Sequence, residues 1–147
     1  MRNRSGIILI ENNKLALIER YRNGLHYFIF PGGGIDEGES PQQAAVREAE
    51  EELGIIVEVK QKIAEIFINE NTQHYFLADK ISGEFGTGTG EEYGEYNPKY
   101  GTYLPLWMPI DDVMSNNVLP YELADLVVRC SHEGWPQTPT QIYSEKM

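Results

Sequence analysis

The sequence predicts an α/β fold in which a mixed sheet is covered by helices on both faces. A helix with clear start and stop signals is expected at about residues 41–53, with extended apolar runs on both sides of it in the chain. A second segment of helical periodicity follows at 121–130. With 147 residues, 41% of them hydrophobic and 24% charged, the chain is expected to form one domain over residues 1–147.

The strands are indicated by short apolar runs between turn residues. Runs at 6–10 and 15–19 flank Glu11-Asn12-Asn13-Lys14, which predicts a β-hairpin with an asparagine-rich turn. The remaining runs that predict strands lie at 26–30, 55–59, 63–68, 74–78 and 103–107. The alternation of these runs with the two helices is what favours a mixed sheet.

The helix at 41–53 has capping signals at both ends. Ser40 and Gln43 have the Ser-x-x-Gln spacing of a capping box, and Pro41 suits the first helical position. Gly54 suits the left-handed residue that ends many helices. The side chains expected to pack beneath the helix are Val46, Ala49 and Leu53.

Three carboxylates of this helix indicate a metal site. Glu48, Glu51 and Glu52 are three and four residues apart, and such spacings place side chains on one face of a helix. Like charges so close together repel each other, so a purely structural helix gains nothing from them. A hard cation such as Mg²⁺ is held by carboxylate oxygens and keeps positions for water and phosphate. We therefore expect an acidic metal platform.

Residues 33–55 contain glycine, acidic and basic residues at specific spacings. The positions are, in chain order, Gly33, Glu39, Arg47, Glu48, Ala49, Glu51, Glu52, Gly54 and Ile55. This pattern resembles the Nudix box, the signature of Nudix hydrolases. Ala49 is the one departure, because the family pattern prefers a larger aliphatic residue there. The segment 27–33 and Trp107-Met108-Pro109 also look like Nudix proteins.

The resemblance implies an α/β/α sandwich and an enzyme that depends on Mg²⁺, with Mn²⁺ as a substitute. It implies metal ligands at Glu48, Glu51, Glu52 and the carbonyl of Gly33, and it places Arg47 with these glutamates in the catalytic set. Arg47 is expected to orient Glu51 through an i,i+4 ion pair. The base that accepts a proton from the attacking water is left open between Glu48, Glu52 and acidic residues of a later loop.

That loop is the irregular, glycine-rich segment at 82–101. Glu91 and Glu92 are candidates for an additional metal ligand or for the base, and Tyr93 is a candidate for stacking on a nucleobase. The alternatives are a solvated acidic loop and tyrosines that pack on the domain.

Two arginines are candidates for binding substrate phosphates. Arg20 and Arg22 share one face if the strand at 15–19 continues that far. The alternative is a solvated turn that leads into Asn23-Gly24.

Charge and composition narrow the class of partner. A net charge of −11 argues against binding a nucleic-acid backbone, so the expected partner is a small nucleotide complexed with metal. No apolar run is long enough for a membrane span or a signal peptide, and a cytoplasmic location is expected. Cys130 is the only cysteine and is expected to be a buried thiol. Both a monomer and a homodimer fit.

The expected reaction is hydrolysis of a nucleoside diphosphate linked to another group. Nucleoside triphosphates, including oxidised ones, are the lead substrate class. ADP-ribose or another nucleotide sugar, dinucleoside polyphosphates, and a non-catalytic nucleotide-binding regulator of the same fold are the alternatives. The proline associated with ADP-ribose enzymes beyond the box is not evident, because that region reads Glu70-Asn71-Thr72.

Overall fold

The structure is a computed structural model that describes residues 3–88 and 101–144. Its elements are β1 (Arg4–Glu11), β2 (Lys14–Arg22), β3 (Leu25–Ile29), β4 (Gly32–Gly34), α1 (Pro41–Leu53), β5 (Ile55–Ile68), β6 (Asn71–Gly83), β7 (Leu104–Pro109), α2 (Ile110–Val113), β8 (Val118–Leu119), α3 (Tyr121–Glu133) and β9 (Thr140–Ser144). None of the helices in these residues has the length and hydrophobicity needed to cross a membrane.

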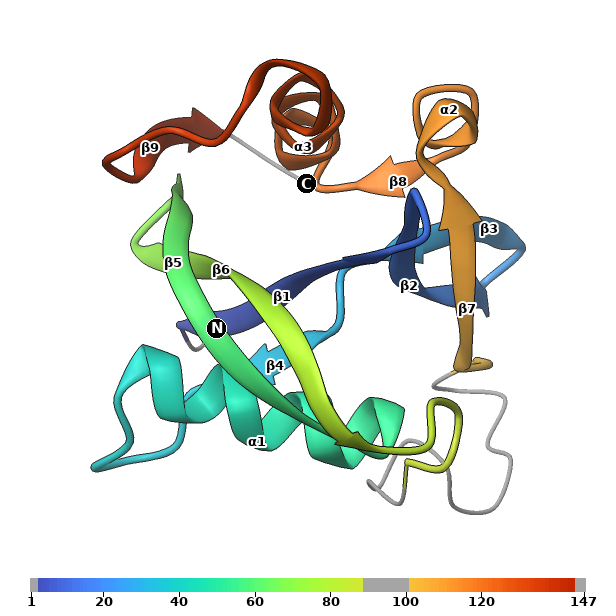
Figure 1. The fold of residues 1–147 in the computed structure, drawn as a ribbon, viewed down its shortest axis with the longest axis horizontal. Coiled ribbons are helices and arrows are strands. Elements are labelled where there is room, and N and C mark those ends of the chain that lie inside the picture. Colours follow the sequence, from blue (N-terminus) through green and yellow to red (C-terminus); the bar gives the residue numbers. More distant parts are fainter. Residues whose placement is uncertain (1–2, 89–100, 145–147) are drawn as a thin grey trace.

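The strands form one mixed sheet, as the sequence predicts. Their order is β8-β3-β2-β1-β6-β5-β9, with β4 added to β1 and β7 added to β2. The pairs β1–β6, β3–β8 and β5–β9 are parallel, and the other pairs are antiparallel. Figure 1 shows α1 on one side of the sheet and α3 on the other. The arrangement confirms an α/β fold with helices on both faces.

The β1–β2 hairpin turns where the sequence predicts. Asn12 and Asn13 both have positive φ, 52° and 60°, which is the backbone that a two-residue hairpin turn needs. Strand β2 then continues to Arg22, beyond the predicted end at residue 19. Arg20 and Arg22 therefore lie on a strand rather than in a solvated turn.

Helix α1 has both predicted caps. The N–H of Gln43 donates to Ser40 Oγ over 3.1 Å, and the N–H of Ser40 donates to Gln43 Oε1 over 2.9 Å. Gly54 ends the helix at φ 77°. The buried apolar side chains beneath the helix are Ala44, Ala45, Ala49 and Leu53. Val46, which the sequence placed with them, is only half-buried.

The segment after α1 differs from the prediction. The runs at 55–59 and 63–68 belong to a single strand, β5, which keeps its pairing with β6 through three register shifts. Two of these shifts insert a residue into β5, at Lys60 and at Ile63, and each reverses the alternation of buried and exposed positions, so the sequence pattern resembles two strands. The sequence analysis also missed β4, α2, β8 and β9, which are short.

Two hydrophobic cores fill the space on the two faces of the sheet. One lies under α3 and includes Ile8, Leu15 and Leu123, and the other lies under α1 and includes Ile7 and Ile18. Neighbouring residues of β1 therefore serve opposite faces, as expected for a central strand. The core on the α1 side fixes the position of the helix that carries the acidic residues.

His74 lies in a polar cluster on the α1 side of β5 and β6, next to a lysine. Lys62 Nζ donates to His74 Nδ1 over 2.7 Å and to Glu65 Oε2 over 2.9 Å. Burial lowers the pKa of His74 below its usual value, and the Lys62 charge lowers it further against the opposing effect of Glu65. The neutral imidazole is thus the form that fits the folded protein.

Protonation of His74 should therefore cost stability. Because the folded-state pKa lies below the unfolded value, the unfolded chain binds more protons, and the free energy of unfolding falls as the pH drops below about 6.5. His74→Gln keeps an acceptor for Lys62 and removes this titration, so its free energy of unfolding should change less between about pH 7 and pH 5. His132→Gln, on the exposed surface of α3, is the matched control. Urea denaturation with the same pH profile for parent and His74→Gln would contradict the assignment.

Candidate active site

The site lies where the short strand β4 (Gly32–Gly34) approaches α1, and we call this glycine segment the glycine turn. Gly32–Gly34 pairs antiparallel with Arg4–Gly6 of β1, so the turn backbone is held as part of the sheet. A Cβ on Gly33 would lie 2.5 Å from the carboxyl carbon of Glu48. A side chain at this position would therefore push the Glu48 carboxylate away from the turn, and glycine lets it stay there.

The three glutamates of α1 lie in different environments. Glu52 is 3% exposed, and its Oε1 accepts a hydrogen bond from the Gly32 N–H over 2.6 Å. The Glu48 side chain is 12% exposed and lies against Gly33. The Glu51 side chain is 43% exposed. Glu48 and Glu52, one helical turn apart, thus face the glycine turn, whereas Glu51 lies closer to solvent than a single carboxylate face implies.

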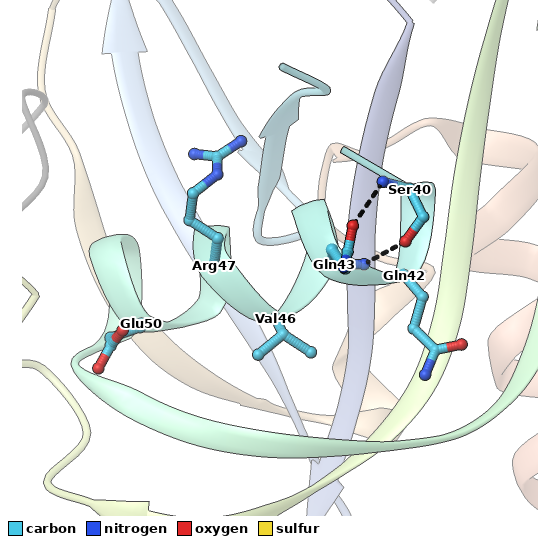
Figure 2. Close-up of a pocket in the computed structure, with 6 residues that line it drawn as sticks. All are labelled: Ser40, Gln42, Gln43, Val46, Arg47 and Glu50. Carbon is cyan, nitrogen blue, oxygen red and sulfur yellow. Dashed lines mark hydrogen bonds between the residues drawn. The ribbon is translucent and has the colours of Figure 1, made fainter. Parts of the chain in front are cut away.

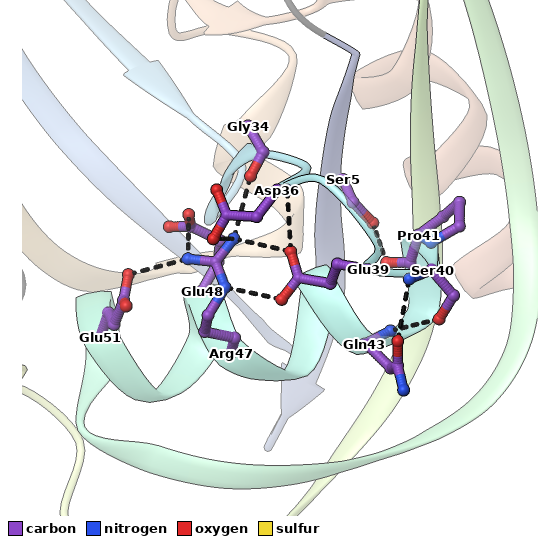
Figure 3. A network of polar contacts seen from close by, with 10 residues as sticks. All are labelled: Ser5, Gly34, Asp36, Glu39, Ser40, Pro41, Gln43, Arg47, Glu48 and Glu51. Carbon is purple, nitrogen blue, oxygen red and sulfur yellow. Dashed lines mark hydrogen bonds and ion pairs between the residues drawn. The ribbon is translucent and has the colours of Figure 1, made fainter.

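Arg47 joins the helix to the loop and turn before it (Figure 3). Its Nε and Nη2 donate to the two carboxylate oxygens of Glu39 over 2.8 and 3.0 Å. Nη2 also donates to the Gly34 carbonyl over 2.9 Å, and Nη1 donates to Glu48 and Glu51 over 2.9 and 3.1 Å. The predicted Arg47–Glu51 pair is confirmed. One planar guanidinium thereby holds three carboxylates and a turn carbonyl in fixed relation.

The same contacts determine the charge states. The hydrogen bond from Arg47 lowers the pKa of Glu39, and burial opposes this effect only in part. The bond to Glu39 is also the main cause of a raised pKa at Arg47. Asp36 adds an ion pair at 3.5 Å, and its backbone N–H donates to Glu39. The site therefore contains a permanently charged, multiply bonded arginine that favours the ionised form of Glu39.

The carboxylate and carbonyl oxygens of this site suit Mg²⁺ or Mn²⁺. In the described residues, however, the carboxylates do not converge on one position where an ion would be coordinated. Within residues 3–88 and 101–144, no group of three His, Cys, Asp or Glu side chains is placed to hold a metal ion. Glu48 and Glu51 are instead engaged by Arg47. Carboxylate and carbonyl oxygens are the ligand types that these cations prefer, so the residues fit the group in chemistry.

The two candidate phosphate-binding arginines differ in burial, since Arg20 is buried and Arg22 is exposed. Arg20 is 5% exposed, and its Nε donates to the Thr102 carbonyl over 2.7 Å. Its guanidinium lies 3.7 Å from the centroid of the Tyr103 ring. Arg22 is exposed at the end of β2. No pattern in the sequence predicts that Tyr103, far along the chain, lies on Arg20.

The acidic loop candidates Glu91, Glu92 and Tyr93 lie outside the described residues. The segment that precedes them is anchored on the end of α1. The N–H of Gly86 donates to the Leu53 carbonyl over 2.9 Å.

A separate hollow lies along the outer side of α1 (Figure 2). Its lining residues are Ser40, Gln42, Gln43, Val46, Arg47 and Glu50. Glu48, Glu51 and Glu52 do not line it, so it is distinct from the surface between α1 and the glycine turn.

Comparison with known proteins decides the family. A family described as NUDIX domain matches residues 1–127. The chain belongs to the Nudix hydrolase family. The residues that α1 and the glycine turn bring together are those of its signature, and Nudix hydrolases generally use a divalent metal and act on small nucleotides.

Several named relatives are similar to this Nudix hydrolase. The 8-oxo-dGTP diphosphatase of Escherichia coli (strain K12) is 37% identical over 82 residues, 54% of this chain and 52% of the relative. An RNA pyrophosphohydrolase of Vibrio cholerae is 50% identical over 74 residues, 50% of this chain and 41% of the relative. An ADP-ribose pyrophosphatase of Methanocaldococcus jannaschii is 31% identical over 96 residues, 60% and 57% of the two chains. The matches thus span about half the length of these relatives.

A solved structure supports the fold over the whole chain. The NUDIX hydrolase from Nitrosomonas europaea superposes with a TM-score of 0.77 and covers 99% of this Nudix hydrolase and 81% of its own chain. At 18% sequence identity, this likeness shows the fold alone.

The bond between Glu39 and Arg47 should contribute measurably to stability. Because the folded-state pKa of Glu39 is lowered, its contribution is present above the unfolded pKa and is lost as the pH falls through the folded value. Glu39→Gln should lower the free energy of unfolding by about 1–3 kcal/mol at neutral pH, and this difference should shrink as the pH falls through the folded-state pKa of Glu39. Glu58→Gln, an exposed strand residue, is the control. A Glu39→Gln variant as stable as the parent at neutral pH would refute this role.

Proposed function

We propose that this Nudix hydrolase is a divalent-metal-dependent pyrophosphohydrolase that cleaves a nucleoside diphosphate linked to another group. Nucleoside triphosphates, including oxidised ones, are the lead substrate class. The observation that carries the proposal is the placement of Glu48 and Glu52 against the backbone of Gly32 and Gly33. Carboxylate oxygens beside a glycine carbonyl are the type of ligand that holds a divalent cation with a bound diphosphate.

Glu48, Glu51, Glu52 and the Gly33 carbonyl would hold Mg²⁺, or Mn²⁺ in its place, with Glu91 and Glu92 as further ligands from the loop. When bound, the metal offsets charge on the phosphate oxygens and lowers the pKa of a water molecule. Arg47 donates to one carboxylate oxygen of Glu48 and to one of Glu51 in this structure, so ligation through those two oxygens would require Arg47 to change its contacts.

Among the box residues, Glu48 suits the general base better than Glu52. A base must reach the proton that it removes. Glu52 is 3% exposed and holds the Gly32 N–H, whereas the Glu48 side chain is 12% exposed. Arg47 orients Glu48 through its bond to Oε1. Glu92 and Glu91 remain the alternative bases from the loop, and Tyr93 is kept as a proposed contact for the nucleobase.

The small-nucleotide class is preferred over RNA because of charge. The relatives carry names for 8-oxo-dGTP, ADP-ribose and RNA substrates, so the family alone leaves the substrate open. A chain of net charge −11 repels a polyanionic backbone, while a single nucleotide complexed with a divalent cation carries far less charge. Because free nucleotides are found in the cytoplasm, we infer that this protein is located there as well.

A substrate panel tests the function directly. The panel contains the common nucleoside triphosphates, 8-oxo-dGTP, ADP-ribose and a dinucleoside polyphosphate, each with Mg²⁺, with Mn²⁺ and with EDTA. We expect hydrolysis of a phosphoanhydride bond that requires the metal and yields a nucleoside monophosphate. Nucleotides that bind without any turnover would favour the non-catalytic regulator instead.

Glu52→Gln should separate the metal role from the structural one. The amide keeps an acceptor for the Gly32 N–H but loses the charge that ligation uses, so turnover should fall by at least about a hundredfold. The new amide N–H₂ in a buried position should cost only modest stability. Glu50→Gln, exposed on the same helix, is the matched control and should keep full activity. Turnover of Glu52→Gln within about threefold of the parent would exclude the metal role.

A further inference from the structure

A row of aromatic side chains lines the α1-facing side of β7. Strand β7 pairs with β2 so that Trp107 lies opposite Ala16, a residue of the core under α1. Tyr103, the residue just before β7, lies on the same side, because it packs against the same core. Both rings are half-buried at the edge of this core. They therefore form part of the surface that the acidic helix also faces.

The row is continuous with the C-terminal end of α1. Phe85 packs on Trp107 with ring centroids 4.6 Å apart. The next residue, Gly86, donates its N–H to the carbonyl of Leu53, the last residue of the helix. Glu51 and Glu52 belong to the last turn of the same helix, so Phe85 and Trp107 lie near the helix end that also carries these two residues.

Arg20 holds the other end of the row. Its guanidinium lies 3.7 Å from the Tyr103 ring centroid and 5.9 Å from that of Tyr27, within the range of cation–π contacts. Its Nε donates to the carbonyl of Thr102. Two further bonds join the backbone of Tyr21 to Thr102, one to the hydroxyl and one from the N–H, both over 3.1 Å. The buried Arg20 guanidinium thus holds Tyr103 in position by contacting one face of its ring.

Burying a guanidinium is costly, and 5% exposure leaves Arg20 little contact with solvent. A hydrophobic side chain would support a strand end at lower cost. Arg20 instead combines a planar stacking surface with a donor for one particular carbonyl, which sets the orientation of the ring above it.

We propose that Tyr103 and Trp107 form the surface on which the nucleobase of the substrate stacks, with Arg20 as the positioning residue for Tyr103. The inference rests on the proposed function, since it assumes that the ligand is a nucleotide. Stacking on aromatic rings tolerates every base, so this surface would supply affinity for nucleotides in general. The phosphates would then extend along the row toward α1.

Binding of reaction products tests the proposal without turnover. The probes are AMP, GMP and the base-free ribose 5-phosphate, each with Mg²⁺, and the signal is the fluorescence of Trp107 in a Trp135→Phe background. We expect the two nucleotides to quench this fluorescence saturably and ribose 5-phosphate to leave it unchanged. Tyr103→Leu should weaken nucleotide binding by at least about fivefold. Its matched control is Tyr143→Leu, an exposed tyrosine on β9.

The arginine is tested in the same assay. Arg20→Met should weaken AMP and GMP binding about as much as Tyr103→Leu does, and Arg20→Lys, which keeps the charge but loses the planar stack, should be intermediate. Arg129→Met, on the exposed side of α3, should bind like the parent. In turnover of the best panel substrate, Arg20→Met should raise KM and change kcat little.

Three results would overturn the proposal. They are absence of saturable quenching of the parent by both nucleotides, parent-like nucleotide binding by Tyr103→Leu, and quenching by ribose 5-phosphate equal to that by the nucleotides. Base-dependent binding without hydrolysis of any panel compound would instead support the stacking surface and reject the proposed function.

Discussion

The site depends on the set of hydrogen bonds made by the Arg47 guanidinium. Without a cation between them, Glu39, Glu48 and Glu51 would repel one another beside the glycine turn. Arg47 donates to all three and also to the Gly34 carbonyl, so one side chain connects the helix, the preceding loop and the turn. Several bonds to one planar group give orientation as well as binding energy, which a lysine at this position would not provide.

The site also depends on a close approach of the β1 and glycine-turn backbone to α1. Small side chains on the buried face of α1 let the helix lie near β1, and Ser5 Oγ donates to the Pro41 carbonyl at its first turn. The turn is held from the other side by its pairing with β1 and by Glu52, which accepts from Gly32. Glu52 therefore has a structural bond in the same place where a metal ligand is proposed. Under the proposed function, metal binding and stability are coupled at Glu52.

Features set by neighbouring residues were predictable, while those set by distant contacts were not. The capping box of Ser40 and Gln43, the Gly54 stop and the Asn12-Asn13 turn all act within a few residues, and each is present. The burial of Arg20 depends on Tyr103, which lies far along the chain. Likewise, the separate environments of Glu48, Glu51 and Glu52 depend on where the glycine turn passes the helix. The spacing alone gives three equivalent carboxylates. The continuous strand β5 was missed because its bulges break the alternation that sequence analysis uses.

Direct measurement of metal binding tests the central claim, that α1 and the glycine turn form a divalent-metal site. The electron paramagnetic resonance signal of free Mn²⁺ reports how much ion the protein takes up during a titration. The account predicts saturable binding by the parent, weakened at least about tenfold in Glu48→Gln and unchanged in Glu50→Gln, which alters the same helix away from the turn. Absence of saturable binding in the presence of nucleotide, or equal affinity in parent and Glu48→Gln, would contradict it.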